Sequence, residues 1–155
     1  MKKYFTILAV MLSMAMVGCD KDETPEEKND AVKASLVGTW EVDDVKGAAY
    51  MGSELIESDI ELPGDFLEEM PLRVTFTKTQ MSLIFEDPED SESNSYTVNA
   101  ETGMIILNGD EEGIDELNYT LSADKKTLTV WFKQDVEEEE EYDSMRITLT
   151  LKKTT

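Results

Sequence analysis

Histidine is absent from the 155 residues, and cysteine occurs once, at Cys19. Because imidazole is missing, Ser-His-Asp and Cys-His nucleophile systems are excluded, together with every zinc site that needs a histidine ligand. A lone cysteine cannot close a disulfide within the chain, so stability has to come from packing. Since the chain has no histidine and a single cysteine, we also expect no metal and no cofactor.

Basic residues are scarce as well. The chain has 14 lysines and arginines against 35 acidic residues, a net charge of −21. A field of this sign repels phosphate backbones, which excludes nucleic acid as a partner. The same charge favours a soluble monomer through self-repulsion.

No apolar run is long enough to span a bilayer. The run Phe5–Val17 is shorter than the roughly 20 residues that a transmembrane helix needs, and Lys2 and Lys3 precede it. This arrangement is typical of a signal peptide over residues 1–18, which takes no part in the fold.

Cys19 follows Met16-Val17-Gly18, and this segment resembles the lipobox of bacterial lipoproteins, although that family usually has leucine where Met16 stands. The resemblance implies that Cys19 carries acyl chains and anchors the protein to a membrane. Each buried CH₂ contributes about 0.8 kcal/mol, so two or three chains anchor stably. The alternative is a free cysteine at the end of the signal peptide.

Lys21-Asp22-Glu23 resembles the export signal of Bacteroidota lipoproteins, which implies a location on the outer face of the outer membrane. The composition of residues 19–31 predicts a flexible acidic tether, and the folded domain is expected over residues 32–155.

Beyond one short helical turn ending at Gly38, apolar and polar residues alternate with the period of a β-strand. Short turns between the strands predict an antiparallel meander. We expect an all-β fold, an eight-stranded up-and-down barrel, because closure removes exposed edges; a two-sheet sandwich is the alternative. The eight expected strands are residues 39–45, 72–76, 81–85, 95–99, 104–108, 117–121, 128–132 and 145–151.

One connection, residues 46–71, is much longer than the others. Its segment 64–70 predicts a short helix with Asp65 near the start, where the helix dipole favours an acid. The connection is either a lid over one end of the barrel or a plug that completes the core.

Gly38-Thr39-Trp40 enters the first strand as a Gly-x-Trp motif. With eight meandering strands and a long first loop, the chain is similar to a lipocalin-like domain, and to small lipocalin-like lipoproteins of Bacteroidota. The resemblance implies that Trp40 closes one end of the barrel and that an arginine of the last strand packs on it. Arg146 is the candidate, although strand alternation turns it away from Met145 and Ile147.

The inward positions of the expected barrel are apolar. They suit a small hydrophobic ligand, but the same side chains could fill a barrel of eight strands. Both interpretations stay open. The candidate cavity residues are Val74, Phe76, Leu83, Phe85, Tyr96, Tyr119 and Phe132.

Catalysis is not expected, because 35 acids make accidental carboxylate pairs unavoidable. Asp44 alone has inward parity among the acids, and a β-bulge at residues 43–44 would explain it equally well. Residues 108–113 resemble the start of a calcium loop, but a hairpin turn is the favoured interpretation.

Outward apolar residues offer another class of function, an accessory surface protein that binds a protein or glycan partner. Ile84, Ile105 and Trp131 have outward parity. Asp143-Ser144-Met145 also resembles an O-glycosylation motif of exported Bacteroidota proteins, which implies a glycan on Ser144.

Overall fold

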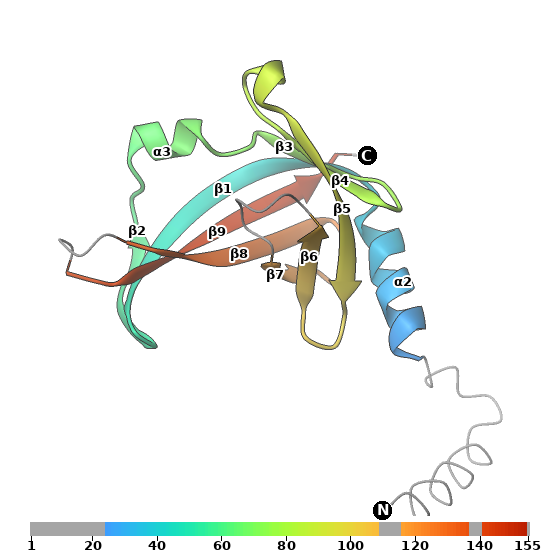
Figure 1. The fold of residues 1–155 in the computed structure, drawn as a ribbon, viewed down its shortest axis with the longest axis horizontal. Coiled ribbons are helices and arrows are strands. Elements are labelled where there is room, and N and C mark those ends of the chain that lie inside the picture. The colour runs from blue at the N-terminus through green and yellow to red at the C-terminus, as the bar shows by residue number, and fades with distance from the viewer. Residues whose placement is uncertain (1–23, 109–115, 137–140, 155) are drawn as a thin grey trace, which may run out of the picture.

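The structure is a computed structural model that describes residues 24–108, 116–136 and 141–154. Eight antiparallel strands run in the order β1-β3-β4-β5-β6-β7-β8-β9, and pairing of β1 with β9 closes them into a lipocalin-like barrel (Figure 1). The predicted closed barrel is therefore confirmed over the sandwich. The strands are β1 (Gly38–Met51), β3 (Arg73–Phe76), β4 (Gln80–Ile84), β5 (Glu92–Asn99), β6 (Met104–Asn108), β7 (Glu116–Leu121), β8 (Thr127–Asp135) and β9 (Ser144–Lys153).

A ninth strand, β2 (Glu54–Ile60), adds to the barrel because β1 is longer than its neighbour β3. One edge of β1 pairs with β9 from Trp40 to Tyr50. The other edge pairs with β3 over residues 38–41 and with β2 over residues 47–51. The sequence does not predict β2, because its segment ELIESDI does not alternate and residues 54–59 are all exposed.

The β1–β9 register shifts between Val42 and Asp44, where β1 forms an irregularity of the β-bulge type. Asp44 is exposed. The bulge interpretation of its parity is confirmed, because one extra residue reverses the alternation along the rest of the strand.

The connections differ in length at the two ends of the barrel. At the end where β1 starts, residues 77–79, 100–103 and 122–126 join the strands. At the opposite end, the connections that the structure describes in full are residues 52–72 and 85–91. We call the end with the short connections the narrow end and the end with the long connections the wide end. Long loops on a rigid scaffold are the usual place for binding residues.

The core is one cluster of apolar side chains contributed by all eight barrel strands and by a helix. Ile105 is completely buried and pairs with Val98 and Leu117, so its predicted outward position is wrong. The segment MIILN is apolar on both faces, which leaves its parity undefined in the sequence. Ile84 and Trp131 are half-buried.

The helix α2 (Pro25–Leu36) starts earlier than the single turn predicted, so residues 25–31 are helical rather than a tether. Thr24 and Glu27 form a capping box: the Glu27 N–H donates to Thr24 Oγ1 at 3.2 Å, and the Thr24 N–H donates to Glu27 Oε2 at 3.3 Å. Pro25 at the first helical position supports the same start. The acid-rich composition had concealed this signal.

The long connection completes the core in part. It contains β2 and the short helix α3 (Gly64–Glu68), which confirms the predicted helical segment. Leu62 is buried and lies directly over Gly47, where an added Cβ would come within 2.9 Å of Leu62 Cδ2. Phe66 and Met70 pack half-buried against the core. No helix of the described ranges is long and apolar enough to cross a membrane.

Candidate functional site: the two ends of the barrel

The narrow end is sealed by the Gly-x-Trp motif. Gly38 has a φ of 133°, a conformation that residues with side chains rarely adopt, and it turns the chain from α2 directly into β1. Trp40 is completely buried, and its indole Nε1–H donates to the Leu36 carbonyl at 2.8 Å. The tryptophan thereby satisfies a carbonyl that the end of α2 leaves without a helical partner.

The cation at this end is Lys153 rather than Arg146. Lys153 pairs with Trp40 across β9 and β1, its Nζ lies 5.2 Å from the centroid of the Trp40 ring, and it donates to the Ser35 carbonyl at 2.9 Å. A positive charge here also complements the negative end of the α2 dipole. The signal was present in the sequence, because Lys153 shares the inward parity of Leu151.

Arg146 lies far along β9, opposite Ala48, so it cannot cover Trp40. Its guanidinium Cζ is 5.5 Å from the Tyr50 ring centroid, and Lys133 Nζ is 4.8 Å from the same ring. The resemblance led to the wrong residue because it specified a residue type and a strand but no register. Sequence reasoning also missed this Tyr50 cluster, which strand pairing alone brings together.

A second aromatic pair reinforces the narrow end. Phe76 and Tyr96 meet edge-to-face with ring centroids 5.4 Å apart, and the Tyr96 hydroxyl donates to the Thr77 carbonyl at 2.7 Å. Burial raises the pKa of Tyr96 above its usual value of 10.0, and burial raises the pKa of Tyr119 in the same direction. Both phenols are therefore neutral at physiological pH.

A turn at this end holds a carboxylate with the opposite shift. The Ser122 hydroxyl donates to Asp124 Oδ1 at 2.6 Å, and the Lys126 N–H donates to the same oxygen at 3.1 Å. These two bonds hold the pKa of Asp124 below its usual value of 3.8. Asp124 is fully exposed, so it fixes the turn rather than forming part of a site.

At the wide end, inward-facing apolar side chains are only partly covered. Leu83 pairs with the buried Val74, so it lies on the inward side of its strand, yet it is half-buried. By contrast, Trp40 at the narrow end has no exposed surface. The half-buried apolar residues of this end are Phe66, Met70, Leu83, Phe85 and Met145.

The predicted cavity residues mostly meet in the core. Four are buried and belong to the core cluster: Val74, Phe76, Tyr96 and Phe132. Leu83 and Tyr119 pack half-buried against that cluster. Phe85 follows the last residue of β4 and is half-buried.

Ser144 is 7% exposed, and its hydroxyl donates to Asp143 Oδ1 at 3.1 Å. It pairs with Asp135 on one side and Tyr50 on the other. This covered position disfavours glycosylation of the folded chain. Cys19 and Lys21-Asp22-Glu23 lie outside the described residues, as do residues 109–113 of the calcium-like segment.

Within the described ranges, no three acidic or cysteine side chains are grouped so that they could hold a metal ion. Comparison of the chain with protein-family models, with curated proteins and with solved structures gave no match.

Proposed function

We propose that this chain is a lipid-anchored lipoprotein of the outer membrane, exposed at the cell surface, whose barrel binds a small hydrophobic molecule without catalysing a reaction. The observation that carries the proposal is the difference between the two ends of the barrel. The narrow end is sealed by Trp40, whereas inward apolar side chains at the wide end keep partial exposure.

This difference suits an apolar ligand that enters between the long connections. Covering apolar surface contributes about 25 cal/mol per Å², so half-buried side chains such as Leu83 and Phe85 retain a driving force for contact with an apolar molecule. The neutral phenol of Tyr119, half-buried on an inward position, adds a polar group that could orient such a ligand.

Native mass spectrometry tests the proposal. The chain from residue 21 onward, purified without detergent, is expected to carry an added mass that organic extraction removes, or to acquire one on incubation with fatty acids. Leu83→Asp should abolish the added mass, because it places a charge among the half-buried apolar residues. Leu72→Asp is the matched control, since Leu72 is 58% exposed, and it should leave binding unchanged.

A bare mass that stays unchanged with fatty acids and lipids would contradict ligand binding. That result would favour the second candidate, an accessory surface protein with a filled barrel that binds a protein or glycan partner. The observation that favours this candidate is that six of the seven predicted cavity residues pack in or against one core cluster.

A further inference from the structure

Strand β2 gives the sheet a free edge. Each barrel strand has neighbours on both sides, whereas β2 pairs with β1 alone in the part of the chain that the structure describes. Residues 54–59 are all exposed, and two adjacent apolar side chains, Leu55 and Ile56, are 49% and 50% exposed. An exposed apolar edge strand carries unpaired N–H and C=O groups and is a template for pairing with another chain.

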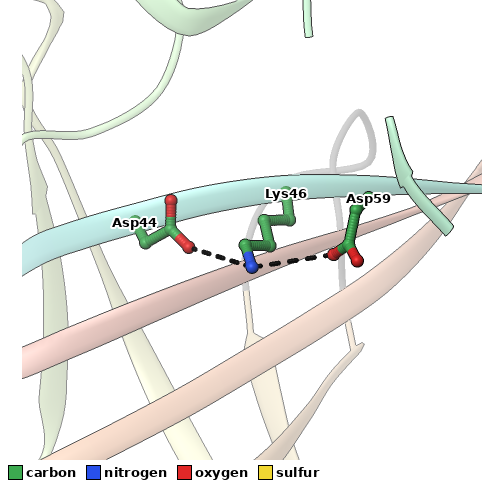
Figure 2. A network of polar contacts seen from close by, with 3 residues as sticks. All are labelled: Asp44, Lys46 and Asp59. Carbon is green, nitrogen blue, oxygen red and sulfur yellow. Dashed lines mark ion pairs between the residues drawn. The ribbon is translucent and has the colours of Figure 1, made fainter. Parts of the chain in front are cut away.

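Exposed ion pairs link the end of β2 to β1. Figure 2 shows Lys46 of β1 between two carboxylates: its Nζ lies 3.6 Å from Asp59 Oδ1 and 3.8 Å from Asp44 Oδ2. Asp59 has a φ of 56°, a conformation uncommon for residues other than glycine, so the regular strand is interrupted near its end. The register of β2 against β1 also shifts between Leu55 and Glu57, so Ile56 is an extra residue. Glu54 and Glu57 then lie on one face of the strand, because their partners Met51 and Ala49 are two residues apart in β1. The segment from Glu54 to Ser58 is the open part of the edge.

The segment that forms this edge carries acids only, although Lys133 of β8 donates to the Gly52 carbonyl just before it at 3.5 Å. Residues 47–72 contain no lysine or arginine, and the cation that precedes them, Lys46, is engaged with Asp44 and Asp59. The acids of this stretch are Glu54, Glu57, Asp59, Glu61, Asp65, Glu68 and Glu69.

This charge decides between two kinds of occupant. Two copies joined through β2 would bring Glu54, Glu57 and Asp59 of one chain against the same acids of the other, and like charges across paired strands are destabilising. The net charge of −21 adds a further repulsion. The acids thus oppose self-association while leaving the backbone groups of the edge open to a strand of opposite charge.

We propose that β2 is a docking edge for an extended segment of a partner protein in which basic and apolar residues alternate. The segment adds to the sheet as a further strand, with main-chain hydrogen bonds to β2, cations beside Glu54 and Glu57, and apolar side chains over Leu55 or Ile56. The proposal is independent of ligand binding in the barrel.

A synthetic peptide of alternating lysine and valine is the probe. In about 0.15 M salt, which screens loose attraction between exposed charges, it should bind the chain from residue 21 onward and slow hydrogen exchange at amides of residues 54–60. A peptide with the same residues in two blocks, Lys then Val, should not, because it cannot present cations on one face and apolar residues on the other.

Ile56→Lys should weaken binding of the alternating peptide by about tenfold, which corresponds to about 1.4 kcal/mol. Leu72→Lys makes the same change of side chain at a site 58% exposed and outside β2, and it should have little effect. Thermal unfolding of both variants checks that the barrel is intact.

Equal weakening by both variants, equal binding of the two peptides, or absence of binding would overturn the proposal. A concentration-dependent dimer in sedimentation, with slowed exchange in β2, would assign the edge to a second copy instead.

Discussion

At the scale of single residues, Trp40 joins two elements that are adjacent in sequence. Its ring fills the narrow end of the barrel, and its Nε1–H satisfies the Leu36 carbonyl at the end of α2. A buried carbonyl that loses its donor retains its full desolvation cost, so this bond matters more than an average hydrogen bond on the surface.

Trp40→Phe should lower the free energy of unfolding by about 1–3 kcal/mol, because phenylalanine keeps an aromatic ring but leaves the Leu36 carbonyl unpaired. Urea denaturation of the two proteins measures the difference. Trp131→Phe is the matched control: Trp131 is half-buried, and its change should cost less than about 1 kcal/mol. A larger loss from the control would show that ring volume, rather than the hydrogen bond, sets the cost.

The resemblance to lipocalin-like domains predicted that Trp40 closes one end of the barrel, because the Gly-x-Trp motif at Gly38 and Trp40 can be recognised without knowing the register of the strands. It did not predict the partner of Trp40. Which residue of the last strand faces Trp40 depends on the register between β1 and β9, and the bulge after Val42 shifts that register along most of β1. Parity alone favoured Lys153 over Arg146, but nothing in the sequence fixed how far along β9 the contact falls.

At the scale of elements, α2 is attached to the barrel at several points. Asn29 Oδ1 accepts from the Ala100 N–H at 2.8 Å, Lys33 Nζ lies 4.9 Å from the Tyr96 ring centroid, and Lys153 Nζ bonds the Ser35 carbonyl. The helix has little apolar surface to bury, since Leu36 is its one buried residue. Polar contacts therefore carry much of its attachment.

Lys153→Met should destabilise the fold by about 1–2 kcal/mol, because methionine keeps the apolar stem but removes the donor and the charge at the C-terminal end of α2. Lys152→Met changes the net charge equally, yet Lys152 is exposed and donates to Thr127 Oγ1 in a hairpin, so its effect should be smaller. Hydrogen exchange of α2 amides locates the change: only the Lys153 variant should accelerate it. Equal acceleration in both variants would contradict the role of Lys153.

The elements that alternate were the ones that the sequence could predict. All eight barrel strands bury one face, and burial of one face is what produces the period of two. β2 is exposed on both faces and α2 is mostly polar, so neither carries a periodic signal. The start of α2 could nevertheless be predicted from the capping box of Thr24 and Glu27. The sequence of β2 has no such signal, because β2 forms on the part of β1 that extends beyond β3.

At the scale of the whole molecule, charge opposes folding. The chain has a net charge of −21, and the described residues form three ion pairs, all between side chains about half exposed or more. Such pairs contribute little, and compaction brings the remaining acids closer together.

The thermal unfolding midpoint should therefore rise as sodium chloride increases from about 0.01 M to about 0.5 M, because shorter screening lengths relieve the self-repulsion. Differential scanning calorimetry at neutral pH measures this. Near the sequence pI of about 4.1 the net charge vanishes, and the dependence on salt should flatten or reverse. A midpoint that falls with salt at neutral pH would mean that the ion pairs outweigh the repulsion.

The early start of α2 limits the distance between the folded domain and a membrane. If Cys19 carries the lipid, residues 20–23 alone separate it from the capping residue Thr24, and five fully extended steps reach about 17 Å. Such a short linker would keep α2 and the narrow end of the barrel close to the bilayer surface. The wide end and the open edge of β2 lie away from α2 (Figure 1), so both proposed binding surfaces would project outward, toward molecules that approach from the surrounding medium.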